Sequence, residues 1–130
     1  MIKMVKRVLV IDDFADIRRM FCYALEDTPY KVDTAASGTK GIVLHRKNKY
    51  DLIFLDLNMP GLNGVEVLHK IRRFDKEVPI CIVTAFYQEF IEGLTLAHNE
   101  GLKFEIINKP VSLKQIAVIA SEALEVSKVV

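Results

Sequence analysis

The stretch that most constrains the fold of this chain runs from Leu52 to Gly64 and reads LIFLDLNMPGLNG. It opens with four apolar residues, which are typical of a strand buried on both faces. Asn58, Pro60 and Gly61 then favour a loop. Asp56 is therefore expected at the tip of a buried strand, where a carboxylate is costly unless positive charge lies nearby.

Three other apolar runs end in polar residues in the same way. Residues 8–11 precede Asp12 and Asp13, residues 80–83 precede Thr84, and residues 104–107 precede Asn108, Lys109 and Pro110. A helix-like segment follows each run, and this alternation predicts an α/β fold with a parallel sheet. The carboxyl ends of parallel strands share one edge, outside which ligands bind. We therefore expect five side chains to converge there: Asp12, Asp13, Asp56, Thr84 and Lys109.

The length of 130 residues predicts a single domain over residues 1–130. The net charge of +1 argues against a nucleic-acid surface. No apolar run approaches the roughly 20 residues of a membrane-spanning helix, and no leader segment opens the chain, so no membrane insertion is expected. Cys22 and Cys81 are expected to be buried, reduced thiols, which favours a cytoplasmic location.

The pattern predicts ten elements besides the loops. Strands are expected at residues 7–11, 30–35, 52–55, 80–83 and 104–107, the second of them at a sheet edge. Helices are expected at 14–27, from Ser37 to 48, from Asn63 to 74, at 87–100, and from Ser112 to 127. Gly93 should make the helix at 87–100 the least stable of the five.

Histidines and a basic cluster allow two interpretations. The cluster of His45, Arg46, Lys47 and Lys49 could bind an anion, but positive charge near a helix C-terminus is commonly explained by the helix dipole. His45, His69 and His98 lie on three predicted helices without ligand spacing, so we interpret them as ordinary polar residues.

The polar residues at the strand ends, in this order, resemble the receiver domain of two-component response regulators. The resemblance rests on Asp12-Asp13, on Asp56 within DLNMPGLNG, on Thr84-Ala85 and on Lys109-Pro110. It covers the whole chain. It implies a flavodoxin-like three-layer sandwich with a five-stranded parallel sheet in the order 2-1-3-4-5.

The chemistry of a phosphoryl acceptor agrees with these residue types. A carboxylate attacks a phosphoryl group only if positive charge offsets their repulsion, and an oxygen-rich acidic pocket suits Mg²⁺, with Mn²⁺ as a possible substitute. By resemblance, Asp56 is the phosphoacceptor, and it shares the metal with Asp12, Asp13 and the backbone carbonyl of Asn58. Lys109, Thr84 and Ala85 would then contact the phosphoryl group.

The resemblance also implies residues that switch conformation and residues that tune hydrolysis. The family usually carries an aromatic residue three positions before the lysine, where this chain has Ile106. A bulge could let Phe104 serve instead. The expected switch residues are thus Thr84, Phe104, Ile106 and Pro110. Asn58 and Phe86 should tune hydrolysis of the phosphorylated aspartate, because Phe86 is expected at the mouth of the site.

The expected function is a phosphoacceptor in two-component phosphorelay signalling. The donor would be a sensor histidine kinase or a phosphotransfer protein, and residues 87–127 would bind a downstream protein or a second copy. The only catalytic activities expected of the chain would then be self-phosphorylation from small donors and autodephosphorylation. It could be a stand-alone regulator or an excised receiver.

Two alternatives to this function stay open. One is a degenerate receiver or another binding module on a flavodoxin-like scaffold. Intact Asp56, Thr84 and Lys109 argue against it. The other is a phosphohydrolase that forms an aspartyl-phosphate and uses a second aspartate as general acid, but this chain has Asn58 at that position.

Overall fold

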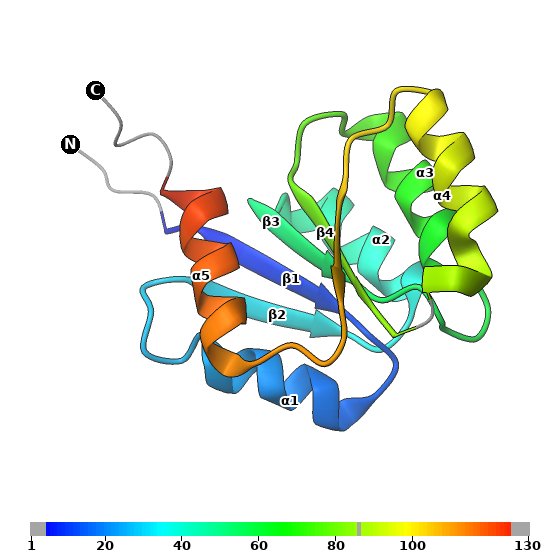
Figure 1. Cartoon of the computed structure of the whole chain (residues 1–130). Helices are drawn as coiled ribbons and strands as arrows, with labels where there is room; N and C mark the ends of the chain where they lie inside the picture. Colours follow the sequence, from blue (N-terminus) through cyan, green and yellow to red (C-terminus); the bar gives the residue numbers. More distant parts are fainter. Residues whose placement is uncertain (1–4, 86, 126–130) are drawn as a thin grey trace.

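A computed structural model of the chain describes residues 5–85 and 87–125, and these residues form one five-stranded parallel sheet with helices on both faces (Figure 1). The strand order is β2-β1-β3-β4-β5, as predicted. The elements along the chain are β1 (Arg7–Ile11), α1 (Ala15–Ala24), β2 (Lys31–Ala35), α2 (Gly38–Asn48), β3 (Leu52–Leu55), α3 (Gly64–Phe74), β4 (Ile80–Thr84), the 3₁₀ turn η1 (Tyr87–Phe90), α4 (Ile91–Asn99), β5 (Glu105–Asn108) and α5 (Leu113–Leu124).

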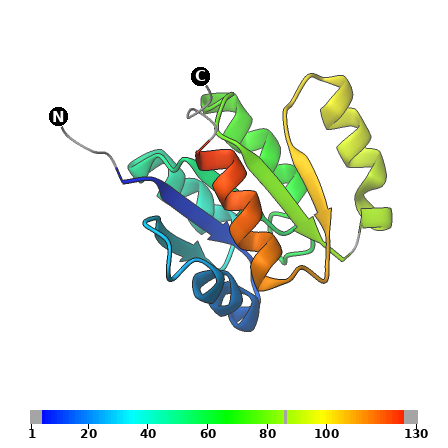
Figure 2. The same ribbon diagram turned by 60° about the vertical axis from the view of Figure 1, so that its left-hand side comes forward.

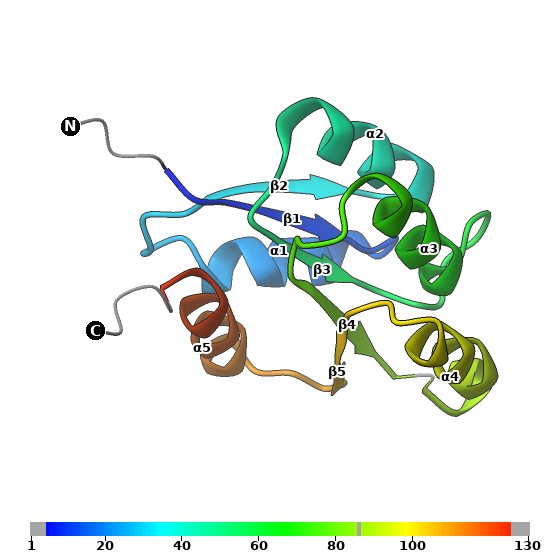
Figure 3. The same ribbon diagram turned by 90° about the horizontal axis from the view of Figure 1, so that it is seen from above.

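The helices form two outer layers. Helices α1 and α5 cover one face of the sheet and α2, α3 and α4 cover the other, which is clearest from above (Figure 3). After a turn of the molecule, α5 stands in front of the central strands (Figure 2). Strands β1, β3 and β4 are apolar up to their carboxyl ends because both faces are buried under helices. The polar residues at the strand ends therefore follow directly on buried, packed strands.

Side-chain caps confirm three of the predicted helix starts. Ser37 accepts a hydrogen bond from the backbone of Lys40 at the start of α2. Asn63 and Ser112 each form a reciprocal capping box at the starts of α3 and α5. Each cap satisfies backbone N–H groups that the first turn of a helix leaves without partners.

Several predicted boundaries are wrong. Helix α1 is shorter than the predicted 14–27, since Phe14 is extended and the backbone turns after Ala24. The helix predicted at 87–100 is interrupted, with η1 preceding α4. Strand β5 begins at Glu105, one residue later than predicted, and α5 ends at Leu124, three residues before the predicted Ser127.

The prediction that both cysteines are buried is wrong for Cys22. Cys81 lies buried within β4, whereas Cys22 lies exposed on the outer side of α1. Leu25 and Phe21 are the fully buried residues of that helix region. The spacing that turns them toward the sheet places Cys22, next to Phe21, on the solvent side.

His45 is also different from the ordinary polar residue we expected, because it is fully buried at the amino-terminal edge of the sheet. Its Nδ1 accepts a hydrogen bond from the backbone N–H of Tyr50 at 3.1 Å, so its Nε2 donates to Asp75 at 2.8 Å. Burial alone would raise the pKa of Asp75, but this bond and two backbone N–H donors outweigh it and lower the pKa. His45 is therefore buried inside the protein, whereas Arg46, Lys47 and Lys49 of the predicted cluster are exposed.

Arg72 is a second buried polar residue at this edge. Its guanidinium donates two hydrogen bonds to the backbone carbonyl of Lys103, at 2.7 and 3.1 Å, and one to the carbonyl of Asp75. It thereby ties α3 to the segment that leads into β5.

None of the helices formed by the described residues has the length and hydropathy that a bilayer crossing requires.

Candidate functional site

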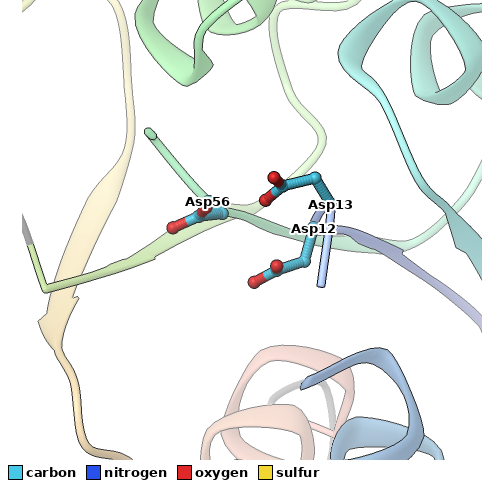
Figure 4. Close-up of side chains that lie close together, drawn as sticks. All are labelled: Asp12, Asp13 and Asp56. Atoms are coloured by element: carbon cyan, nitrogen blue, oxygen red, sulfur yellow. The ribbon is translucent and has the colours of Figure 1, made fainter. Parts of the chain in front are cut away.

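Three carboxylates gather where β1 and β3 end. The two strands are neighbours, and the backbone N–H of Asp56 donates to the carbonyl of Ile11 at 3.0 Å. Carboxylate oxygens of Asp12, Asp13 and Asp56 lie within 4.8 Å of one another. Figure 4 shows the three groups turned to the same side of the strand ends. Asp12 and Asp56 are only 4% and 6% exposed, so little water reaches them.

Lys109 brings a positive charge to this cluster from the far end of the chain. Its Nζ lies 3.3 Å from Oδ2 of Asp12 and 3.4 Å from Oδ1 of Asp56. Its backbone N–H donates to the carbonyl of Thr84 at 2.9 Å, continuing the pairing of β4 with β5. The ammonium group therefore bridges two buried carboxylates that come from different strands.

The electrostatics of the cluster are unbalanced. Burial and the nearby charges of Asp12 and Asp13 raise the pKa of Asp56 to about 6, although Lys109 acts in the opposite direction. Three carboxylates lie close to a single ammonium group, so negative charge is in excess and a further cation would be attracted to the site. Their hard oxygen donors and close spacing are compatible with a divalent metal ion.

Arg18 lies at the site and is a residue that the sequence reasoning did not assign to it. Its Nη1 donates to the backbone carbonyl of Asp12 at 2.8 Å. On the other side, the backbone N–H of Phe14 donates to Oδ1 of Asp12 at 3.0 Å. The sequence did contain a signal for this contact. A basic residue near the start of a helix interacts unfavourably with the helix dipole, so its presence there suggests a specific contact elsewhere.

Gly64 is a second residue that the sequence reasoning missed as part of the site. A Cβ atom at this position would lie 2.4 Å from the backbone oxygen of Asp56 and 2.7 Å from Cα of Leu57. Its N–H donates to the carbonyl of Leu57 at 2.9 Å. Only glycine lets α3 start this close to the strand end, and it thereby fixes the loop that carries Asn58.

The remaining predicted site residues lie at different distances from the carboxylates. Thr84 is fully buried at the tip of β4, and Ala85 next to it is exposed. Asn58 is exposed in the loop after Asp56, between buried Leu57 and Met59. Phe86 lies outside the described residues. The structure therefore brings Thr84 to the expected edge and leaves the Phe86 prediction untested.

In the described part of the chain, the three predicted switch residues of the β5 region belong neither to the carboxylate cluster nor to its ion pairs. Phe104 and Ile106 are half-buried and pack against the core on the α2, α3 and α4 side. Pro110 is exposed and follows Lys109 through a cis peptide bond. The register with β4 is uninterrupted from Glu105 to Asn108, so the bulge suggested for Phe104 is absent from the described strand.

Comparisons with known proteins agree with this geometry. A family model described as the response regulator receiver domain matches residues 8–121. The chain is 31% identical over 111 residues to a response regulator receiver protein of Anaeromyxobacter, which covers 85% of this chain and 45% of that protein. It is 43% identical over 83 residues to the transcriptional regulatory protein ResD of Bacillus subtilis, which covers 64% and 34%. The chain thus spans less than half the length of these relatives.

Solved structures show the same fold. A receiver domain protein of Methanospirillum hungatei, described as CheY-like, has 25% identity and a TM-score of 0.85, and the match covers 96% of this chain and 98% of that one. The five-stranded parallel sheet in the order 2-1-3-4-5 is therefore shared well beyond the level of sequence identity.

Proposed function

Because the chain belongs to the response regulator receiver domain family, a signalling family of two-component systems, we propose that Asp56 accepts a phosphoryl group from a phosphohistidine. The observation that carries this proposal is the placement of Lys109 Nζ, within 3.4 Å of the buried carboxylates of both Asp12 and Asp56 in a triad completed by half-buried Asp13. The donor would be a sensor histidine kinase or a phosphotransfer protein. The proposal takes residues 1–130 as one receiver domain.

The proposed transfer uses the chain's own groups in distinct roles. An oxygen of Asp56 forms the new bond to phosphorus, the bond from phosphorus to the histidine nitrogen breaks, and the imidazole leaves with its electron pair. Lys109 exchanges its contact with Asp56 for the phosphoryl oxygens. The Thr84 hydroxyl donates a hydrogen bond to them, and Ala85 leaves room for the group.

The metal in this proposal is Mg²⁺, with Mn²⁺ as a substitute. Asp12, Asp13, Asp56 and the backbone carbonyl of Asn58 would hold it. When bound, it offsets the negative charge that develops on the phosphoryl oxygens. Added positive charge also favours the ionised form of Asp56, whose pKa of about 6 in the metal-free protein lies above the ordinary value.

The proposal extends to regulation and location. Thr84, Phe104, Ile106 and Pro110 would change position on phosphorylation, and Asn58 and Phe86 would set the rate of hydrolysis. Residues 87–127 would bind a downstream protein or a second copy of the chain, without direct binding of nucleic acid. Beyond self-phosphorylation from small donors and autodephosphorylation we propose no enzymatic activity. The location would be cytoplasmic.

Incubation with acetyl phosphate and Mg²⁺, followed by mass spectrometry of the intact protein, tests the proposal. We expect one phosphoryl adduct that disappears in Asp56→Asn and on addition of a chelator. Asp27→Asn is the matched control, because Asp27 is exposed and lies outside the cluster.

An adduct that persists in Asp56→Asn or without metal would contradict the assignment. If the native protein formed no adduct with either acetyl phosphate or a phosphorylated histidine kinase domain, a degenerate receiver would be the better interpretation.

A further inference from the structure

A groove of about 510 Å³ lies between α2 and α3, and its lining includes neither the three carboxylates nor any of residues 87–127. One wall is a stripe of α2 with helical spacing that contains Ile42, Val43 and Arg46. The other wall is formed by Leu62 with Lys70 and Arg73 of α3. Val43 is 58% exposed in this groove, although it is a large apolar side chain. The floor is thus apolar and open to a partner.

The groove exists because of how the two helices meet. At the start of α2, a Cβ atom on Gly38 would lie 2.4 Å from Cγ2 of Val67 in α3, so glycine allows close contact there. The lining begins one residue later, at Thr39. Helices α2 and α3 lie side by side (Figure 3). They are in close contact at Gly38, and the groove lies beyond that contact.

The cations of the groove have no carboxylate partner among the described residues. In the described part of the chain, Arg46, Lys70 and Arg73 form no ion pair, and Arg46 instead lies over the ring of Phe74 at 4.2 Å. The nearby carboxylate of Glu66 accepts a hydrogen bond from the backbone of Asn63 in the capping box of α3. No acidic side chain lines the groove among the described residues.

The surface around the groove is also positively charged. Between residues 37 and 74, the exposed charged side chains are Lys40, Arg46, Lys47, Lys49, Glu66, Lys70 and Arg73. Six of these seven are basic, although the net charge of the whole chain is only +1. A partner that complements this region must therefore be acidic as well as apolar.

We propose that the groove between α2 and α3 binds an acidic amphipathic helix of a partner protein. The apolar side of that helix contacts Ile42, Val43 and Leu62, and its carboxylates pair with Arg46, Lys70 and Arg73. This mode of recognition places apolar anchors at helical spacing in a groove and lets charges on its rim select the partner. Nucleic acid fits less well, because phosphates gain nothing from the exposed apolar floor. The site lies outside the phosphoacceptor edge and does not depend on it.

A designed peptide provides the test. A helical peptide of about 18 residues carries leucines along one stripe and glutamates beside them, a length at which isolated helices become stable. Its matched control has lysine in place of each glutamate. Titration of ¹⁵N-labelled protein should shift resonances of residues 39–46 and 70–73, with saturation below about 1 mM. The glutamate peptide should bind at least about tenfold more tightly than the lysine peptide.

Variants of the protein separate the groove from general charge effects. Val43→Asp and Arg73→Glu should each weaken binding about tenfold. Val5→Asp and Lys31→Glu, at exposed positions outside both the groove and residues 87–127, make comparable chemical changes and should leave binding unchanged.

Several results would overturn the proposal: no saturable binding, equal binding of the lysine peptide, or unchanged affinity in Arg73→Glu. Tighter binding of a single-stranded oligonucleotide at the same residues would assign the groove to nucleic acid. Self-association that Val43→Asp abolishes would assign it to a second copy of the chain.

Discussion

At the scale of single residues, Asp56 is held in an environment that disfavours its charge. It is almost fully buried beside Asp12, and one ammonium group serves both carboxylates. The resulting pKa of about 6 makes the metal-free site a source of instability above that pH. Ionised Asp56 is therefore destabilised by burial and by repulsion from Asp12, and a bound cation or conversion to a phosphorylated aspartate would relieve this cost.

The stability of the metal-free protein should therefore depend on Asp56 and pH. Unfolded Asp56 loses its proton near its ordinary pKa of 3.8 and the folded form near 6, so the folded state binds more protons between these values. Stability then falls as the pH rises through this window. Asp56→Asn should be more stable than the native protein near pH 8, by at most about 3 kcal/mol. Urea unfolding in a chelator measures the difference.

The same comparison contains its own controls. The advantage of Asp56→Asn should vanish at about pH 3.5, where Asp56 is protonated in both states, and it should shrink when Mg²⁺ is added. Asp27→Asn removes an exposed carboxylate and should change little. A constant advantage of Asp56→Asn at every pH would show that charge is not its cause.

Sequence reasoning located the carboxylates and the lysine but missed two residues that hold them. Asp12, Asp56 and Lys109 follow apolar runs, and the end of a buried strand is visible in the pattern. The contact of Arg18 with a backbone carbonyl depends on how α1 starts, and the need for glycine at position 64 depends on a close approach of backbone atoms. Neither has a periodic signature.

At the scale of elements, the junction between β3 and α3 is the tightest part of the site. Gly64→Ala should destabilise the protein by about 2 kcal/mol, because the new methyl group meets backbone atoms that cannot move independently of Asp56. It should also slow phosphorylation by acetyl phosphate. Denaturant unfolding and adduct formation measure the two effects.

Gly93→Ala in α4 is the matched control for this substitution. The three atoms nearest to its Cβ would belong to the Val65 side chain, the closest at 3.2 Å, and alanine favours helix formation by about 1 kcal/mol. Its net effect should be smaller than that of Gly64→Ala. If both variants lost the same stability, contact with the Asp56 backbone would not be the reason.

The elements after β4 are the expected route of the signal. Helix α4 follows the 3₁₀ turn η1 and has no side-chain cap at its start, and β5 carries Lys109 at its end. Hydrogen exchange in residues 87–110 should change when a beryllofluoride adduct forms on Asp56, because Lys109 moves toward the adduct.

Lys109→Ala should still form the adduct but lose the change in exchange. Lys114→Ala, on the first turn of α5, is the control and should respond like the native chain. A response confined to residues near Asp56, or a full response in Lys109→Ala, would exclude this route. Phe104→Ala with an undiminished response would remove that aromatic residue from it.

The positions of the elements were predicted better than their ends. Strand order followed from the family resemblance, and three helix starts followed from Ser37, Asn63 and Ser112. The shortened α1 and the 3₁₀ turn before α4 depend on local backbone geometry without a side-chain signal. Burial of His45 depends on Tyr50 and Asp75, which are distant partners.

At the scale of the whole molecule, the two edges of the sheet differ in kind. The carboxyl edge gathers charges that are only partly compensated, at Asp12, Asp56 and Lys109. At the amino edge, the buried polar side chains of His45 and Arg72 form hydrogen bonds with protein partners. Substitutions at the amino edge should therefore act on stability, because removing one member leaves buried partners without hydrogen bonds.

Lys109 arrives at the site on the last strand of the sheet, and β5 has a neighbour on one side only. The carboxylates belong to the first 56 residues of the chain and meet each other as soon as β1 and β3 pair. During synthesis, a growing chain that has emerged only as far as β4 therefore carries the acidic cluster without its lysine. The cluster thus gains its lysine only when β5 joins the sheet, and a transient detachment of β5 would leave the carboxylates without that charge.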